Sequence, residues 1–134
     1  MKIKVLLIMP EREVQTVKIP WSSKFIKALI GNELLKIRLD NNIMLIANKD
    51  ADLTEFNRAV GENIILGTFI VVATKNKHRV SMTKKEIRKY TNIFKLRRHK
   101  RKIDIYKNDY LEEYYSNQRK MKQRNVVTTK YVAA

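Results

Sequence analysis

Apolar and polar residues alternate over several short runs in the first half of the chain, and this alternation is typical of β-strands. Residues 2–9 (KIKVLLIM) have lysines near their start and aliphatic side chains on both faces towards their end. This pattern predicts a strand that becomes more buried along its length. Pro10 and three charged residues interrupt the run, and residues 14–19 predict a return strand that Pro20 closes. The first twenty residues therefore predict a β-hairpin.

A second hairpin is predicted immediately before the middle of the chain. Residues 34–39 and 43–47 alternate in the same way and flank the polar residues Asp40, Asn41 and Asn42. Asparagine tolerates the left-handed backbone that a tight turn uses, so a turn is expected at these positions.

The next run is apolar on both faces. Residues 64–73 (IILGTFIVVA) have no polar face, which predicts a strand in the middle of a sheet, with Phe69 in the core. Gly67 within this run predicts a bulge or a close approach of another backbone. The polar residues 48–62 before it predict a loop or a short irregular helix, and the basic residues 75–79 after it predict a loop.

Two stretches carry the signals that begin a helix. Ser22 is placed to cap a short helix that ends at Gly31, with Phe25 and Leu29 towards the core and Ile26 as a third candidate.

The second helix begins in the basic half of the chain. Thr83 and Glu86 form a T-x-x-E capping box. Ile87, Tyr90 and Phe94 then follow at helical spacing, and after the charged residues 95–102 a second set continues at steps of three and four, namely Ile103, Tyr106, Tyr110 and Tyr114. This spacing predicts one long helix, or two helices with a break near residues 100–104.

Together these elements predict an α+β fold. We expect a small mixed or antiparallel sheet of about five strands, one short helix and a long basic C-terminal helical segment. The predicted division is a compact α+β domain, residues 1–94, and a basic helical extension, residues 95–134. The β-prone residues 125–134 at the end are either a disordered tail or an added strand.

Charge is distributed unevenly, and this changes the expectation for the second half. The 134 residues include 29 Lys and Arg against 13 Asp and Glu, which gives a formal net charge of +16. Residues 1–74 carry 10 basic and 8 acidic residues, whereas residues 75–134 carry 19 and 5. This asymmetry predicts a polyanionic partner for the second half.

The basic charge is densest in KLRRHKRK, residues 95–102, a run that is too charged to pack in a core. Guanidinium and ammonium groups suit the phosphates of RNA or DNA, and nearby tyrosines could stack on bases. The alternatives are a solvated helix face and a membrane surface, the latter disfavoured because the apolar side carries several tyrosines and Asp104. The candidate nucleic-acid-binding residues are Lys95, Arg97, Arg98, Lys100, Arg101, Lys102, Arg119, Lys120, Lys122 and Arg124.

No arrangement of residues indicates catalysis. His78 and His99 both lie among Lys and Arg, which disfavour a charged imidazole and repel metal ions. Asp109 and Glu113 are spaced to share a helix face, but ion pairs with nearby lysines are the better interpretation. The chain has no cysteine and no glycine-rich phosphate loop. We therefore expect a protein that is not an enzyme and uses no metal or cofactor.

Two further expectations concern location and a second site. No apolar run reaches the roughly 18 residues of a membrane span, so we expect no membrane partner and a cytoplasmic location in a bacterial cell. Asn57 and Arg58 are a candidate functional site on a loop beside the central strand. The structural alternative is that Asn57 stabilises a turn and Arg58 extends over the sheet. The sequence does not indicate an oligomeric state.

Residues 1 to about 94 resemble a family of small proteins known as domain of unknown function 3846. The resemblance is carried by MKIKVLLIMP, LLKIRLDNNIMLIANKD, NRA (residues 57–59), IILGTFIVV and SMTKKEIRKY. It implies a compact α+β domain of phages, other mobile elements and Gram-positive bacteria, and it implies no activity. The sequence departs from the family pattern after Phe94.

These observations predict a non-catalytic phage or mobile-element protein that binds nucleic acid, or a host ribonucleoprotein complex, through its basic C-terminal helix. A second hypothesis is an anti-defence inhibitor of the anti-CRISPR type that docks on a host nuclease complex. A third is a structural or interaction protein whose basic face is only solvated.

Overall fold

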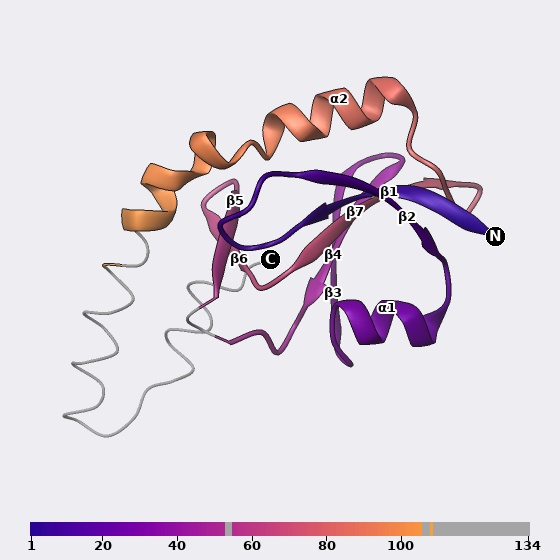
Figure 1. Ribbon diagram of the computed structural model, residues 1–134, viewed down its shortest axis with the longest axis horizontal. Helices are drawn as coiled ribbons and strands as arrows, with labels where there is room; N and C mark the ends of the chain where they lie inside the picture. The colour runs from indigo at the N-terminus through magenta and orange to yellow at the C-terminus, as the bar shows by residue number, and fades with distance from the viewer. Residues whose placement is uncertain (53–54, 106–107, 109–134) are drawn as a thin grey trace.

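The computed structural model describes residues 1–52, 55–105 and 108, and these residues form an α+β fold, as the sequence predicts (Figure 1). The main sheet is antiparallel throughout and has the strand order β2-β1-β7-β4-β3, with β8 paired to the end of β7. Its strands are β1 (Lys2–Ile8), β2 (Gln15–Pro20), β3 (Leu34–Asp40), β4 (Ile43–Asn48), β7 (Phe69–Lys75) and β8 (His78–Val80).

Both predicted hairpins are confirmed. Strands β1 and β2 pair in register from Lys2 opposite Pro20 to Leu7 opposite Gln15, and β3 pairs with β4. The left-handed backbone expected at the asparagines of the second hairpin is not found, however, because neither Asn41 nor Asn42 has a positive φ. Two side chains contact the backbone of the turn instead: the carboxylate of Asp40 accepts a hydrogen bond from the N–H of Asn41 at 2.7 Å, and Nη1 of Arg38 donates to the carbonyl of Asn41 at 3.1 Å.

The predicted central strand over residues 64–73 is two strands. Residues from Phe69 onwards form β7, which lies between β1 and β4 and is buried on both faces, as expected for a central strand. Residues before Gly67 form β6 (Asn63–Leu66), which pairs in a second, two-stranded sheet. Gly67 has φ +73°, a left-handed conformation that turns the chain from one sheet to the other. The sequence marked this glycine but not the size of its effect.

Two segments contain strands that were not predicted: residues 48–62, predicted as a loop or a short irregular helix, and residues 75–79, predicted as a loop. The partner of β6 is β5 (Phe56–Val60), a largely buried strand inside the segment 48–62. Likewise, the basic residues 75–79 include the first two residues of β8, which pairs with the end of β7. Asn76 and Lys77 between them have φ of 52° and 67°. Two successive left-handed residues are typical of the tightest β-hairpin turns.

The two labelled helices cover opposite faces of the main sheet (Figure 1). Helix α1 (Ser23–Leu29) is capped by Ser22, whose hydroxyl accepts from the N–H of Phe25. It packs through Ile26 and Ile30 on Ile3, Val5, Ile46, Ile70 and Val72, whereas Phe25, predicted to face the core, is exposed. Helix α2 (Lys84–Ile93) covers the other face through Tyr90 and Phe94, which pack on Leu6, Ile8, Leu45, Phe69 and Val71.

The capping box at the start of α2 is confirmed in both directions. Thr83 Oγ1 accepts from the N–H of Glu86 at 3.1 Å, and Glu86 Oε1 accepts from the N–H of Thr83 at 2.8 Å. The helix stops at Phe94, and a second helical segment follows over residues 96–105. The break therefore lies near residues 94–95 and not at 100–104.

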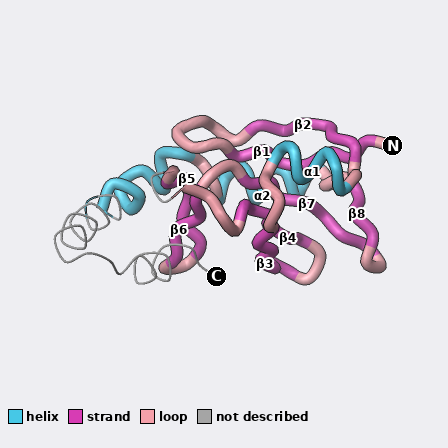
Figure 2. The backbone as a smooth tube through the Cα atoms, turned by 90° about the horizontal axis from the view of Figure 1, so that it is seen from below, coloured by secondary structure: helices cyan, strands magenta, loops and turns pink. Residues whose placement is uncertain are grey.

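The helical segment 96–105 packs on the two-stranded sheet. Ile103 is buried against Phe56, Ala59, Ile64 and Leu66, which form a small cluster separate from the two clusters on the main sheet. Figure 2 shows this arrangement at one end of the molecule, where the β5–β6 hairpin lies beside the helical segment. The predictions for Tyr106, Tyr110, Tyr114 and residues 125–134 lie outside the described residues, and the division after residue 94 stays a prediction.

Candidate nucleic-acid interface

Asn57 and Arg58 lie on β5, and both are completely buried, so the predicted loop site is wrong. The side-chain amide of Asn57 donates to the carbonyl of Ile8 at 2.9 Å and to that of Gly67 at 2.7 Å. These carbonyls belong to the end of β1 and to the break between β6 and β7. Asn57 therefore joins the small sheet to the main one, a structural role that differs from the expected turn.

The guanidinium group of Arg58 holds three parts of the chain together. Nε donates to the carbonyl of Phe94 at 2.8 Å, Nη1 donates to Asn57 Oδ1 at 2.9 Å, and Nη2 donates to the carbonyl of Arg12. Phe94 is the C-cap of α2, where unpaired carbonyls and the helix dipole favour a cation. Burial lowers the pKa of Arg58, and the carboxylate of Glu13 raises it. A guanidinium group stays charged in proteins. Arg58 is therefore a buried cation, and the three oxygen atoms that accept its hydrogen bonds stabilise its charge.

His99 fastens the helical segment 96–105 to its surroundings. Nδ1 accepts a hydrogen bond from the backbone N–H of Ala59 at 3.1 Å, and Nε2 lies 2.7 Å from the carbonyl of Ile93. Because Nδ1 accepts, Nε2 must carry the proton and donate it to Ile93, which fixes one neutral tautomer. With both nitrogens engaged, His99 is neither a free metal ligand nor a free base.

The electrostatic environment of His99 agrees with a neutral imidazole. Burial lowers the pKa of His99, the bond to Ile93 raises it, and the cations of Arg58, Lys102 and Arg98 lower it further. The sequence predicted the effect of neighbouring cations, but the larger cause is burial. The ring also stacks on Phe94, with the two centroids 5.8 Å apart.

Since His99 and Ile103 face the β5–β6 sheet, the opposite side of the helical segment faces outwards. Arg97, Arg98, Lys100 and Arg101 are all exposed. Two other predicted residues are partly buried, namely Lys95 and Lys102. The ammonium group of Lys102 donates to the carbonyl of Gly61 in the β5–β6 turn. The structure therefore brings four of the predicted residues together on one open face.

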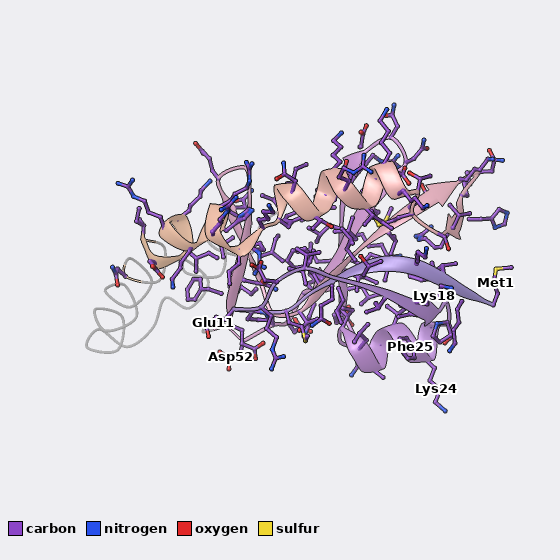
Figure 3. All side chains as sticks on the ribbon, turned by 45° about the horizontal axis from the view of Figure 1, so that its top comes forward. Met1, Glu11, Lys18, Lys24, Phe25 and Asp52 are labelled. Carbon is purple, nitrogen blue, oxygen red and sulfur yellow. The ribbon has the colours of Figure 1, made fainter. Side chains whose placement is uncertain are left out.

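Helix α2 extends this basic surface, a contribution that the sequence analysis missed. Its buried side is set by Tyr90 and Phe94, which leaves Lys84, Lys85 and Arg88 exposed. The same apolar spacing, followed around the helix, would have placed these three cations on the outer side. We call the combined surface the basic ridge; its members are Lys84, Lys85, Arg88, Arg97, Arg98, Lys100 and Arg101. In Figure 3, many side chains on the outer side of the two helices end in nitrogen.

The carboxylates of the described residues form no ion pair with the ridge. The ion pair of α2 joins Lys89 to Asp40, with Nζ and Oδ2 3.7 Å apart, and Lys89 is not a ridge residue. Within residues 1–52, 55–105 and 108, none of the seven ridge cations forms an ion pair with a carboxylate. A row of unpaired cations on a rigid support is the arrangement that attracts a polyanion.

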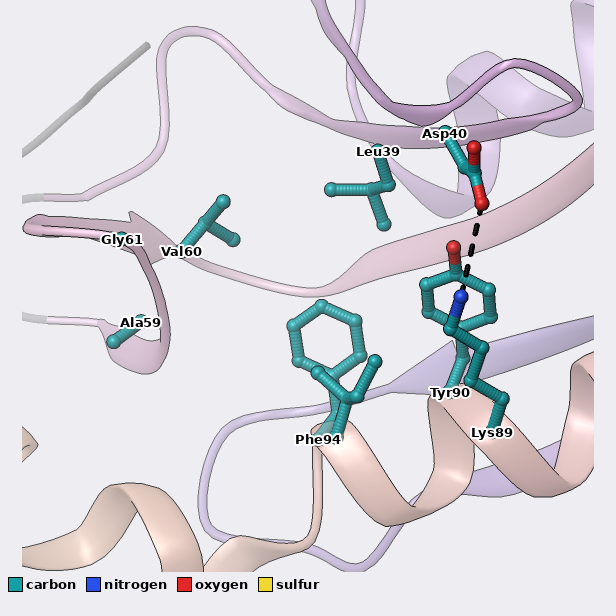
Figure 4. A pocket seen from close by; sticks show the side chains of 9 residues that line it. Leu39, Asp40, Ala59, Val60, Gly61, Lys89, Tyr90 and Phe94 are labelled. Carbon is teal, nitrogen blue, oxygen red and sulfur yellow. Dashed lines mark ion pairs between the residues drawn. The ribbon is translucent and has the colours of Figure 1, made fainter.

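A groove of about 280 Å³ lies beside the ridge, between α2, the tip of the β3–β4 hairpin and the β5–β6 turn (Figure 4). Its walls are mostly apolar and end at the Asp40–Lys89 ion pair: Leu39, Asp40, Ala59, Val60, Gly61, Lys89, Tyr90, Ile93 and Phe94. Burial raises the pKa of Tyr90, and the carboxylates of Asp40 and Glu86 raise it further. The phenol therefore keeps its proton at neutral pH.

Several predicted residues fall outside the part of the chain that the structure describes. These are the basic residues Arg119, Lys120, Lys122 and Arg124 and the acidic pair Asp109 and Glu113. Among the described residues, no cluster of three or more His, Asp or Glu side chains is placed to hold a metal ion. No helix in that part of the chain is both long and apolar enough to cross a membrane.

Comparisons with known proteins extend the picture in one respect. No curated protein and no solved structure matches the chain. Residues 1–95 match the family described as Domain of unknown function (DUF3846). The matched region includes both faces of the main sheet, the buried Asn57–Arg58 pair and all of α2, and it ends at the break before the second helical segment. The chain therefore belongs to the DUF3846 family.

Proposed function

We propose that the protein binds nucleic acid through the basic ridge, mainly by contacts with phosphates, and that its role is non-catalytic. The observation that supports this most directly is the position of the ridge cations. Seven exposed Lys and Arg side chains lie on the outer sides of two consecutive helical segments, whose inner sides are anchored by Tyr90, Phe94, His99 and Ile103.

The dimensions of the ridge suit a phosphate backbone. Helix α2 and the segment 96–105 have about ten residues each, so each spans roughly 15 Å at 1.5 Å per residue. They follow one another along one side of the molecule (Figure 1). The two segments together are roughly 30 Å long. A nucleic-acid strand with one phosphate every roughly 3.4 Å would present about nine charges along this combined length. A single carboxylate on a protein surface would engage far fewer of the cations.

The proposal is tested by reversing four ridge charges together. The variant Arg97→Glu, Arg98→Glu, Lys100→Glu, Arg101→Glu alters only exposed side chains and should keep the circular dichroism spectrum of the parent. In fluorescence anisotropy with labelled RNA and DNA oligonucleotides, it should bind at least tenfold more weakly. Each lost phosphate contact should also flatten the slope of log affinity against log salt by roughly 0.7 to 0.9.

A matched control separates the ridge from net charge alone. Lys24, Lys27, Lys36 and Arg38 are exposed on the side of the sheet that α1 covers. Changing these four residues to Glu alters the net charge equally but leaves the ridge intact. The control should keep most of the affinity and the salt slope of the parent.

Two results would refute the proposal. Equal losses in the two variants would show that binding follows net charge and not the ridge. Absence of binding to every oligonucleotide, together with binding to an assembled host ribonucleoprotein, would favour the inhibitor hypothesis instead.

A further inference from the structure

The groove beside the ridge has the size of a compact ring system. At about 280 Å³ it lies just below the roughly 300–1,000 Å³ of pockets that hold drug-sized ligands. Its apolar walls come from three elements, with Leu39 from β3, Val60 from β5 and Ile93 from α2. Tyr90 and Phe94 add aromatic rings to the same walls (Figure 4).

The groove also presents polar groups that can read the edge of a ring. Tyr90 is only 4% exposed, and its hydroxyl has no hydrogen-bond partner among the described residues. Beside it, the side chains of Lys89 and Asp40 are 57% and 53% exposed, so their ion pair is open to water and can rearrange. Together these groups offer a hydroxyl, a carboxylate acceptor and an ammonium donor at one end of an apolar space.

Cations stand at both ends of the groove. Lys89 lines one end, and at the other end Lys102 donates to the carbonyl of Gly61, which is part of the wall. Lys85 lies one turn before Lys89 on α2, and it is a member of the ridge. A ring seated in the groove would therefore have cationic side chains within reach of phosphates on either side of it.

We propose that this groove holds one unpaired base of a single-stranded nucleic acid, while the flanking phosphates lie on the ridge. The proposal rests on the proposed function and adds a strand class to it. In a duplex, bases are stacked and paired, so their apolar faces are not available to a groove of this kind. A single strand can turn one base out at little cost.

The decisive measurement compares three labelled oligonucleotides of equal length: a mixed-sequence single strand, the same strand with abasic sugars at its central positions, and the matching duplex. Abasic sugars keep every phosphate, so electrostatic binding to the ridge is preserved. Base stacking on protein side chains commonly contributes roughly tenfold in affinity per base. We expect the wild-type protein to bind the complete single strand at least tenfold more tightly than the abasic strand or the duplex.

Two neighbouring substitutions on α2 localise the effect. Ile93→Asp puts a carboxylate in the groove wall, and Asn92→Asp puts the same charge one residue away, at an exposed position that does not line the groove. Their effects on phosphate binding should be equal. Ile93→Asp should therefore reduce binding of the complete strand at least tenfold further than Asn92→Asp does, with no such difference for the abasic strand. Tyr90→Phe removes the free hydroxyl, and it should weaken the complete strand severalfold without changing the thermal midpoint.

The outcomes separate the two proposals. Equal affinity for the complete and abasic strands, or equal effects of Ile93→Asp and Asn92→Asp on the complete strand, would overturn the base site. The proposal that the ridge binds phosphates would still hold if the four-residue ridge variant lost affinity for the oligonucleotides. Failure of every oligonucleotide to bind the wild-type protein would overturn both.

Discussion

Replacing Arg58 by Ala should be among the most destabilising single changes in this protein. The substitution removes three hydrogen bonds from a side chain with no exposed surface. Hydrogen bonds to a charged group contribute roughly 1.5–3 kcal/mol each, so the gross loss is about 5–9 kcal/mol. Two terms reduce it. The carbonyl of Arg12 lies in an exposed loop and can turn to water, and the cost of burying a guanidinium group disappears.

The expected net loss is about 3–5 kcal/mol, since the carbonyl of Phe94 and the side chain of Asn57 lose a buried partner. Urea denaturation followed by circular dichroism would measure it. Arg58→Lys keeps the charge but not the forked geometry, and it should still cost at least about 2 kcal/mol. Arg38→Ala is the control, because exposed Arg38 makes one bond, to the carbonyl of Asn41 at 3.1 Å. A loss below about 1 kcal/mol for Arg58→Ala would refute the idea that this network supports the fold.

Two further predictions concern the core and the buried imidazole. Phe69→Ala should cost about 3–5 kcal/mol in the same denaturation assay, the usual range for a buried aromatic residue; a loss below about 1 kcal/mol would contradict its central position. The pKa of folded His99 lies below the roughly 6.5 of an unfolded histidine, so the folded state binds fewer protons than the unfolded state below that pH. Stability should therefore be unaffected by His99 above about pH 7 and should fall as the pH drops from about 6.5 towards the lowered pKa. Unfolding midpoints measured at a series of pH values should show a flatter profile for His99→Gln than for the wild type; parallel profiles for the two proteins would contradict this.

The features that the sequence predicted correctly are those decided by near neighbours. The capping box of Thr83 and Glu86 and the cap at Ser22 each involve residues three positions apart, and both form as expected. The hairpins likewise follow from alternation on either side of a short turn. The central position of β7 could be inferred because a strand that is apolar on both faces has to be covered on both.

The features that failed depend on contacts between distant residues. Residues 64–73 were predicted as one strand because they are apolar on both sides of Gly67. The backbone turns at Gly67, however, so that the residues before it belong to the two-stranded sheet and those from Phe69 onwards to the main sheet. Arg58 and Asn57 look like loop residues because polar side chains are seldom buried. They are buried because their partners lie on distant parts of the chain, at positions 8, 12, 67 and 94. No pattern within a single segment shows such partners in advance.

The exposure of the candidate interface residues was predicted in part for the same reason. The density of charge marked residues 95–102, in which the structure exposes Arg97, Arg98, Lys100 and Arg101, but which cations face outwards depends on where the helix breaks. That break falls near Phe94, where the carbonyls of Ile93 and Phe94 are taken by His99 and Arg58. The prediction carried the helix past this point because apolar residues resume at helical spacing from Ile103, after the charged residues 95–102.

The buried network also explains how a highly charged segment is held at a fixed orientation. Polar contacts join residues 96–105 to the family domain: the His99 ring with the N–H of Ala59 and the carbonyl of Ile93, the Leu96 N–H with the Glu13 carboxylate at 3.3 Å, and Lys102 with Gly61. Ile103 adds an apolar contact with the β5–β6 sheet. Three of these contacts involve β5 or its turn, namely those of His99 with Ala59, of Lys102 with Gly61 and of Ile103 with the β5–β6 sheet, and Arg58 of the same strand holds the end of α2. Strand β5 thus sets the direction in which both helical segments present their cations, although none of its own side chains belongs to the ridge.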